Sequence, residues 1–391
     1  MFPKVKYESR RWDPLEGDGS FDLWQRKRIP ESYQAAVLEP ISGIPVSLDP
    51  KIEELYSFAV ETIARFDTEL EQKSIIMPEI LLRSESSSSS QIEHLSASAR
   101  NIAMAELGDT SRRNAMTVAG NIRAMRKAFE QSGKISKQTI MAVHSALLEN
   151  TDPEIAGKFR TRQVWIGGSG VSPHNAEFVP PSHEKVPAYI ADWVRFANRK
   201  DIHVLAKAAI AHCQFETIHP FLDGNGRTGR ALIQIMLHEA GLIRKSALPI
   251  SAGLLADVKQ YFRSLEAFRN GDITMIIGQF CKAAIDAVAV GRKTVSNFSS
   301  LRSEWQNKVR ARKDAVVWRL IDLLFARPVV DVKYVVNTLG VTDPAARNAI
   351  NQLMQAGIIK KIDNKMRDVL YEAPEVSALQ DAFAKELARR Q

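Results

Sequence analysis

The stretch HPFLDGNGRTGR, His219 to Arg230, lies between two segments whose apolar residues repeat at helical spacing, which predicts a helix, a short loop and a second helix. Gly224 and Gly226 allow backbone conformations closed to other residues and bring N–H groups close to anionic oxygens. The helix expected to begin near Thr228 adds its positive end. The stretch therefore predicts a phosphate-binding loop in a mainly helical protein.

The charged residues of this stretch have complementary chemistry. Arg227 and Arg230, three residues apart, can hold phosphate oxygens with forked donors. Asp223 is a short carboxylate of the kind that Mg²⁺ takes together with phosphate oxygens. His219 is the natural general base, since an imidazole titrates near neutral pH. These residue types predict a reaction at a polyphosphate.

Two other interpretations compete for the same residues. Gly224, Gly226 and Gly229 satisfy the dinucleotide pattern GxGxxG, but a helix is expected before them and no βαβ unit surrounds them. That interpretation is excluded. A glycine-rich turn with a structural histidine would be the ordinary explanation of a lone His or Gly pair, but so many polar residues with compatible roles favour a functional site.

The rest of the chain divides into four expected regions. Residues 1–45 are rich in charge, proline and glycine and are expected to form an irregular arm, with Trp12 and Trp24 as possible anchors. Helical patterns dominate a second region at 46–110, beginning behind Asp49 and Pro50, and a third at 111–298 that contains the loop. Glycines and prolines interrupt the third region at QVWIGG and AEFVPP, which predicts a β-hairpin flap.

The last region, 299–391, reads as a separate module of three helices followed by two strands joined at Asn364-Lys365. This order resembles a winged helix-turn-helix. Polar residues share a face of its third helix: Arg347, Asn348, Asn351 and Gln352. DNA binding there is balanced against a protein-docking or purely structural role.

Composition narrows the class of protein. The 391 residues include 53 Lys+Arg and 45 Asp+Glu, a formal net charge of +8, which is a mild hint of polyanionic partners. Two distant cysteines fit neither a disulfide framework nor a CxxC motif, so a reducing cytoplasm is the simplest setting. Without an apolar leader or a run of membrane-spanning length, we expect neither secretion nor membrane insertion.

The stretch from His219 to Arg230 resembles the active-site signature of the Fic family, HPFx[DE]GNGRxxR, and matches every defined position. Weaker similarity extends over about Val46 to Ala283. The resemblance implies a helical Fic-type core with a β-hairpin flap and, as activity, transfer of AMP from ATP to a Ser, Thr or Tyr hydroxyl of a target protein, with Mg²⁺.

The resemblance also assigns roles to matched positions. His219 would deprotonate the target hydroxyl, Asp223 would hold the metal, Arg227 would bind phosphate and Arg230 the γ-phosphate. The remaining expected site residues are an anion hole at Gly224, Asn225 and Gly226, Phe221 as a core anchor, Tyr261 beside the adenine or in the core, and a target-clamping flap at Val164, Trp165, Ile166 and Gly167.

The serine-rich stretch SESSSSSQIEHLSAS, Ser84 to Ser98, allows two interpretations. Serine runs are typical of flexible linkers. Ser89 to Glu93, however, resembles the SSxIE part of an inhibitory helix found in many members of the family, whose glutamate would occupy Arg230. His94 stands where the family prefers Gly or Asn, so inhibition could be weaker than usual.

The leading hypothesis is an autoinhibited AMP transferase that binds ATP, Mg²⁺ and a protein substrate. Removal of AMP would use the same residues, and a DNA-binding regulator with a nucleotide-sensing core is the alternative from another class. A homodimer is possible. The target protein, the modified residue and the nucleotide preference are not readable from the sequence.

Overall fold

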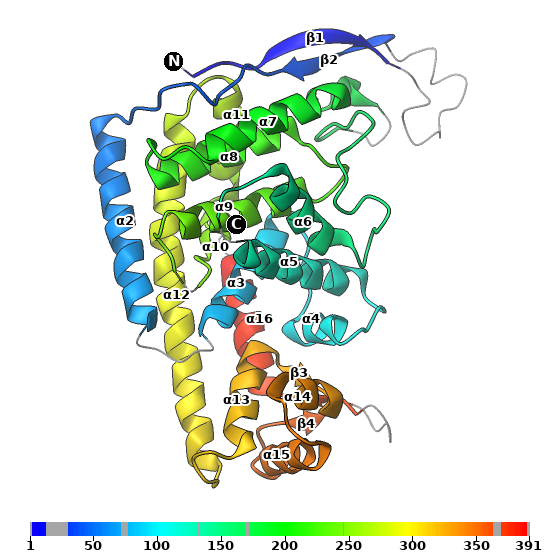
Figure 1. Cartoon of the computed structure of the whole chain (residues 1–391), viewed down its shortest axis with the longest axis vertical. Coiled ribbons are helices and arrows are strands. Elements are labelled where there is room, and N and C mark those ends of the chain that lie inside the picture. The colour runs from blue at the N-terminus through cyan, green and yellow to red at the C-terminus, as the bar shows by residue number, and fades with distance from the viewer. Residues whose placement is uncertain are drawn as a thin grey trace. The chain divides into compact units, whose positions relative to one another are not determined.

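The computed structural model describes residues 2–12, 30–71, 77–131, 133–168, 172–244, 246–362 and 369–388, and it is mainly helical (Figure 1). Trp24 and the Asn364-Lys365 turn lie outside these residues. The described helices up to residue 308 are α2 (Pro50–Glu71), α3 (Met77–Ile92), α4 (Ala99–Glu106), α5 (Arg113–Glu130), α6 (Lys137–Leu148), α7 (Val186–Ala197), α8 (Val204–Ile218), α9 (Asn225–Glu239), α10 (Ile250–Leu255), α11 (Val258–Arg269) and α12 (Thr274–Lys308).

The chain forms two compact units, each assembled from three segments. The first unit contains residues 1–57, 127–240 and 259–281, and the second contains 58–126, 241–258 and 282–391. The predicted domain limits at 46, 111 and 299 stay a prediction. The predicted domains are consecutive along the chain, whereas the two units are not, because α2, α5 and α12 each contribute residues to both units.

Helix α8 is the centre of the first unit. It is buried from Leu205 to Ile218 and packs against α7 and α9, as expected for a helix that is apolar on all sides. Trp193 of α7 donates from Nε1 to the carbonyl oxygen of Ala211 at 2.6 Å. Gly229 of α9 allows the close approach to α8, since a Cβ there would lie 3.1 Å from Nδ1 of His212.

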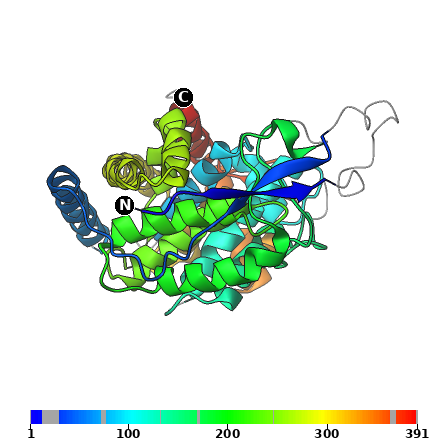
Figure 2. The same cartoon turned by 90° about the horizontal axis from the view of Figure 1, so that it is seen from above.

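The N-terminal residues form a β-hairpin, so the prediction of an irregular arm is wrong for them. Strands β1 (Lys6–Arg11) and β2 (Ser32–Val37) pair antiparallel from Lys6 opposite Val37 to Arg11 opposite Ser32. The segment after β2 is fixed to α7, because Asp192 accepts from the N–H of Ile41 at 2.6 Å. The hairpin can be followed across the helices of this unit in Figure 2.

Helix α12 changes one expectation. An 18-residue window of α12 has a mean hydropathy of 1.3, so by length and composition it could cross a membrane, contrary to the prediction that no such run exists. Buried residues make up 56% of that window, and the core helix of a soluble protein passes the same test. The window is therefore weak support for a membrane span.

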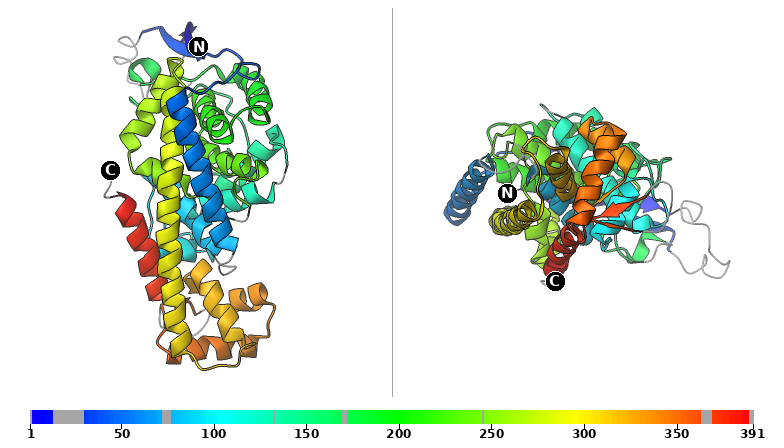
Figure 3. Two further views of the ribbon diagram at one scale, coloured as in Figure 1. Left: turned by 90° about the vertical axis from the view of Figure 1, so that its left-hand side faces the viewer. Right: turned by 90° about the horizontal axis from the view of Figure 1, so that it is seen from below.

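The last part of the second unit contains more structure than the sequence indicated. Helices α13 (Val316–Ala326), α14 (Val332–Leu339) and α15 (Asp343–Gln355) are joined by a sheet of order β3-β5-β4 (Figure 3). Its strands are β3 (Val329–Val330), β4 (Lys360–Lys361) and β5 (Tyr371–Glu372), followed by α16 (Pro374–Ala388). Strand β3 and helix α16 were not predicted, and the winged-helix identity of the module stays a prediction.

The serine run is not a flexible linker, because it forms most of helix α3 and is largely buried. Its hydroxyls bond back to the preceding turn, as Ser86 does to the carbonyl of Leu82 and Ser90 to that of Ser86, both at 2.9 Å. Glu85, fully buried, accepts from both the N–H and the hydroxyl of Ser251 at the start of α10, at 2.9 and 2.6 Å.

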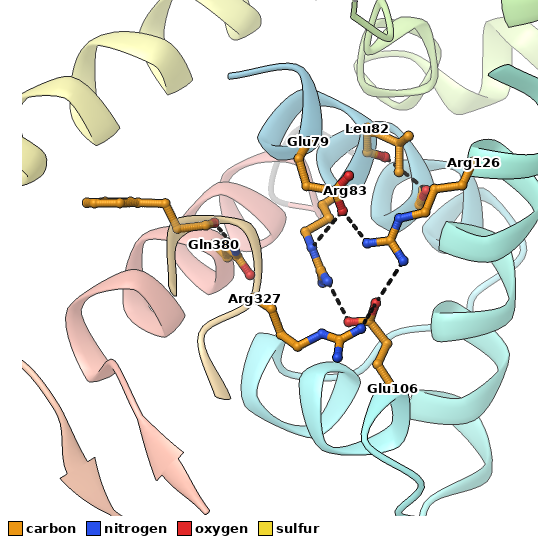
Figure 4. A network of polar contacts seen from close by, with 9 residues as sticks. Glu79, Leu82, Arg83, Glu106, Arg126, Arg327 and Gln380 are labelled. Carbon is orange, nitrogen blue, oxygen red and sulfur yellow. Dashed lines mark hydrogen bonds and ion pairs between the residues drawn. The ribbon is translucent and has the colours of Figure 1, made fainter. Parts of the chain in front are cut away.

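A buried charge network ties α3 to its neighbours (Figure 4). Glu106, at the end of α4, pairs with Nη2 of Arg83 at 2.5 Å, Nη2 of Arg327 at 3.1 Å and Nη1 of Arg126 at 3.4 Å. Arg126 also bonds Glu79 of α3. Burial alone would raise the pKa of Glu106, but the three guanidinium groups outweigh it and hold that pKa below its ordinary value.

We expect Glu106→Gln to lower the free energy of unfolding by about 3 kcal/mol, because it leaves buried guanidinium groups without their shared carboxylate. Urea denaturation measures the loss. Glu61→Gln is the matched control, since its pair with Arg65 is exposed on both sides and should contribute less than about 1 kcal/mol. Equal losses in the two variants would contradict a stabilising role for the network.

Candidate active site

A six-residue loop joins the buried helices α8 and α9 and carries most of the expected site. His219 caps α8 in the left-handed conformation, with φ 49° and ψ 62°, and its N–H donates to the carbonyl of Phe215 at 2.9 Å. Gly224 precedes α9 with φ 75°. Left-handed backbone costs a residue other than glycine about 1–2 kcal/mol, so its surroundings must hold His219 in place.

The imidazole of His219 is oriented by the last turn of α8. Its Nδ1 lies 3.3 Å from the carbonyl oxygen of Glu216 and 3.9 Å from a carboxylate oxygen of the same residue. A carbonyl oxygen only accepts, so Nδ1 carries the hydrogen in this contact and Nε2 bears the lone pair. The side chain is 20% exposed, which gives a reacting group access to the base.

The side chain of Asn225 closes the loop on itself. Its Oδ1 accepts from the N–H of Phe221 at 2.9 Å and its Nδ2 donates to the carbonyl of Phe221 at 3.0 Å. The amide is therefore structural. The anion-binding groups expected here are the N–H groups from Gly224 to Gly226, which start α9 and have no carbonyl one turn earlier within the helix.

Arg227 has buried donors suited to an anion. The residue is 1% exposed, and its Nη2 lies 3.0 Å from Oδ2 of Asp223. Its Nε and Nη1 have no hydrogen-bond partner within the described residues. Buried donors are normally satisfied, and a phosphate oxygen would satisfy these with charge-assisted bonds.

Asp223 is suited to hold a metal together with a ligand. Its side chain is 57% exposed at the loop. Among the described residues, no three His, Cys, Asp or Glu side chains gather as a metal site. Mg²⁺ commonly uses one or two carboxylates plus phosphate oxygens, so the single carboxylate fits Mg²⁺ only when a phosphate is present.

Arg230 and Tyr261 are both 1% exposed. Burial, followed by the charge of Arg230, lowers the pKa of His212 to about 3. The hydroxyl of Tyr261 lies 2.8 Å from Nε2 of the same histidine, which places Tyr261 in the core. Its adjacency to adenine stays a prediction.

His144 is a supporting residue of the site that was not identified from the sequence. Its Nδ1 accepts from the N–H of Gly157 at 2.9 Å, so Nε2 carries the hydrogen and donates to the carbonyl of Asp223 at 3.0 Å. The ring stacks on Phe221 with centroids 3.6 Å apart and a 4° angle between planes. Burial is the main cause that lowers its pKa to about 4, so the neutral form is held.

The described residues of the expected flap form very little strand pairing. Ile166 and Phe178 form an isolated antiparallel bridge, with the N–H of Ile166 donating to Phe178 at 2.8 Å. Trp165 packs edge-on against Trp12 at 5.7 Å, so its side chain faces the N-terminal hairpin. Val164 and Gly167 flank this bridge, and target docking at the flap stays a prediction.

The end of α3 places Glu93 directly after the helix. The N–H of Leu95 donates to the carbonyl of Ser90 at 3.0 Å, and that of His94 to Gln91 at 2.9 Å, the two bonds of a Schellman cap. His94 is left-handed, with φ 57°, where Gly or Asn is ordinarily favoured. Ser89 is fully buried within the helix. Arg230 belongs to the other unit, so its pairing with Glu93 stays a prediction.

Parts of the chain are similar to known proteins. Residues 134–237 match the model of the Fic/DOC family. Protein adenylyltransferase fic-1 of Caenorhabditis elegans is 31% identical over 174 residues, covering 43% of this chain and 31% of the relative. Protein adenylyltransferase Fic of Drosophila willistoni is 34% identical over 114 residues, covering 28% and 21%. The chain spans less than a third of the length of these curated relatives.

A solved structure shows the same fold over most of the chain. The crystal structure of a Fic family protein from Desulfovibrio desulfuricans G20 has a TM-score of 0.54 at 22% identity and covers 84% of this chain and 97% of that one. The predicted mainly helical Fic-type fold is confirmed by this likeness.

We expect the stability of the protein to fall as pH drops from about 6.5 towards 4, because His144 is held neutral in the folded state while an unfolded histidine takes up a proton. Between pH 7 and 5 this residue alone accounts for at most about 2 kcal/mol. His144→Gln keeps a donor and an acceptor without titrating. Urea denaturation at both pH values should show a smaller fall in this variant, and an equal fall would contradict the assignment.

Proposed function

The chain carries a Fic domain at residues 134–237, and from this premise we propose that it is a protein adenylyltransferase that moves AMP from ATP to a hydroxyl of a target protein. The observation that carries the proposal is Arg227, whose buried Nε and Nη1 have no partner in the described part of the chain, on the first turn of the helix that follows His219. This arrangement supports binding of a polyphosphate beside a general base.

In the proposed reaction, Nε2 of His219 accepts the proton of the incoming hydroxyl. The hydroxyl oxygen forms a bond to the α-phosphorus, and the bond from that phosphorus to the bridging oxygen breaks, releasing pyrophosphate. Because Nδ1 is directed to the carbonyl of Glu216, the ring presents the correct nitrogen for this transfer. The target would be a Ser, Thr or Tyr residue held at the flap.

The phosphates would be held by the donors already described. Arg227 and the N–H groups at the start of α9 would bind them, and Arg230 would hold the γ-phosphate, as the resemblance implies. Asp223 would hold Mg²⁺, which supplies charge neutralisation of the phosphates when bound. The exposed carboxylate and the unsatisfied guanidinium donors of its neighbour fit such a metal–phosphate ligand.

We further propose that Glu93 restrains this activity by pairing with Arg230 and displacing the γ-phosphate. The support is that α3 is a buried helix with a defined C-terminal cap, so Glu93 has a fixed place on its own element. A bidentate carboxylate pair, partly removed from water, can outweigh an exposed salt bridge, which is worth about 0–1 kcal/mol.

The proposal is tested by the intact mass of purified protein after incubation with ATP and Mg²⁺. We expect Glu93→Gly to gain the mass of an AMP group and the double variant with His219→Ala to gain nothing, because the second change removes the base. Wild type should gain less than Glu93→Gly. If no variant is modified while ATP binds, self-modification is excluded, and AMP removal or a nucleotide-dependent DNA-binding role would take precedence.

We expect His94→Gly to strengthen the restraint, since glycine adopts the left-handed cap without the cost of about 1 kcal/mol that a side chain pays. Hydrogen exchange of residues 88–95 should slow by about fivefold, and AMP incorporation should fall below the wild-type level.

His94→Ala is the matched control for this variant, because it removes the imidazole without giving the backbone its freedom. If alanine slows exchange as much as glycine does, the cap geometry is not what limits α3.

A further inference from the structure

Arg160 is a buried arginine whose side-chain partners, among the residues that the structure describes, are all backbone carbonyls. It is 3% exposed and forms no ion pair with any residue that the structure describes. Its Nε donates to the carbonyl of His219 at 2.8 Å, and Nη1 to that of Arg162 at 3.2 Å. Nη2 bonds the carbonyls of Pro181 and, at 3.4 Å, Ile218. Burial lowers its pKa only to about 10, so the guanidinium stays charged at neutral pH.

These four carbonyls belong to two functional elements. Ile218 and His219 end α8, where carbonyls have no partner within the helix and a cation is favourable. Arg162 and Pro181 begin and end the flap. The backbone N–H of Arg160 also donates to Pro220 at 2.9 Å. One residue therefore joins both arms of the flap to the backbone that carries the candidate base.

The flap depends on such side-chain bonds because, among its described residues, strand pairing is limited to one bridge, between Ile166 and Phe178. Gln163 contributes a second clamp, with Nε2 donating to Val164 at 3.0 Å and to Pro180 at 2.8 Å. Gln163 thus spans the flap arms without reaching α8. Arg160 bonds both the flap and the end of α8, whereas Gln163 bonds the flap arms. Comparing variants of the two residues therefore distinguishes closure of the flap from its alignment with His219.

The conformation of His219 adds the reason why alignment is needed. A left-handed histidine persists only where its neighbours hold it, and the bond from Arg160 fixes the carbonyl that this conformation turns out of the helix. Loss of that bond would let the residue relax towards ordinary backbone angles and move the imidazole.

We propose that Arg160 is a positioning residue that keeps the flap and His219 in one register, so that a hydroxyl presented at the flap meets Nε2 of the base. The proposal rests on the proposed function, since it takes the flap as the docking site of a protein target. It assigns Arg160 no contact with the reacting atoms.

The chemistry of the guanidinium makes the assignment testable with conservative variants. Lysine keeps the charge, but its single small ammonium group lacks the planar fork with which the arginine guanidinium reaches carbonyls on two elements. Arg160→Lys should therefore stay folded while losing part of the alignment. Gln163→Ala is the control, because it weakens the flap clamp and leaves the carbonyls at the end of α8 untouched.

Two measurements on the full chain test the proposal independently of activity. The first is the ¹³C-histidine NMR signal of His219, identified by its loss in His219→Ala, followed from pH 5 to 9. The second is hydrogen exchange of residues 162–168 and 176–181. Arg160→Lys should shift or broaden the His219 signal and speed flap exchange by about tenfold, whereas Gln163→Ala should change exchange alone.

An unchanged His219 signal in a folded Arg160→Lys protein would overturn the proposal, and so would an equal shift in Gln163→Ala. Rates of AMP transfer in the Glu93→Gly background provide a separate test. There, Arg160→Lys should lower kcat, and Gln163→Ala should chiefly raise KM for a protein target. If Glu93→Gly transfers no AMP, the proposed function fails, while the NMR and exchange results still decide the role of Arg160.

Discussion

The junction between α8 and α9 must satisfy the polar ends of two helices inside the protein, and the first unit is arranged around that requirement. Its carbonyl groups receive donors from distant residues and from the junction itself: Arg160 bonds the end of α8, His144 bonds Asp223, and Asn225 at the start of α9 bonds Phe221. On the donor side, Arg227 keeps Nε and Nη1 without partners in the described structure. The protein thus supplies partners for the carbonyl groups of the loop but not for these donors, which under the proposed function would bind an anion and make this turn a binding site as well as a connection.

Helix α3 is stabilised in a different way, because its serines bury little apolar surface. Its position depends on desolvated polar contacts, chiefly Glu85 with Ser251 and Arg83 with Glu106. Such contacts hold firmly when complete and lose much of their value when one partner is missing. They suit an element that is fixed at rest and can be released as a unit, which is the behaviour that restraint by Glu93 would need. Arg327, at the C-terminal end of α13, also pairs with Glu106. The C-terminal module that contains α13 is therefore connected to α3 through this carboxylate.

Local chemistry was readable from the sequence, and distant backbone contacts were not. The loop from His219 to Arg230 was predicted because all its groups lie within a few residues of one another, and the helix start at Asp49 was predicted from its own capping side chain. His144 and Arg160 donate to carbonyls 79 and 59 residues away. Any residue offers such a carbonyl, so no spacing reveals the pair.

The serine run wrongly indicated a flexible linker for a related reason. Its composition is typical of linkers, whereas its burial depends on partners in other segments. One signal was available: no glycine or proline interrupts residues 79–98, as a helix requires and a linker does not. The N-terminal hairpin was harder to predict, because its described strands, residues 6–11 and 32–37, are short segments of a long charged stretch. In both cases the local sequence is compatible with the element, and tertiary contacts determine that it forms.

The ion pair between Asp223 and Arg227 bears on which ligand the site prefers. Under the proposed function, a phosphate would bind Nε and Nη1 of Arg227 and leave the bond from Nη2 to Asp223 in place, whereas a metal alone would compete with Arg227 for the carboxylate. A metal alone would thus leave the guanidinium poorly compensated, and water cannot make up the loss because the Arg227 side chain is 2% exposed. A phosphate that already carries Mg²⁺ offers a partner to both groups at once. Under the proposed function, the site would therefore prefer the metal complex of the nucleotide to the metal alone, and the affinity for Mg²⁺ would depend on the presence of the nucleotide.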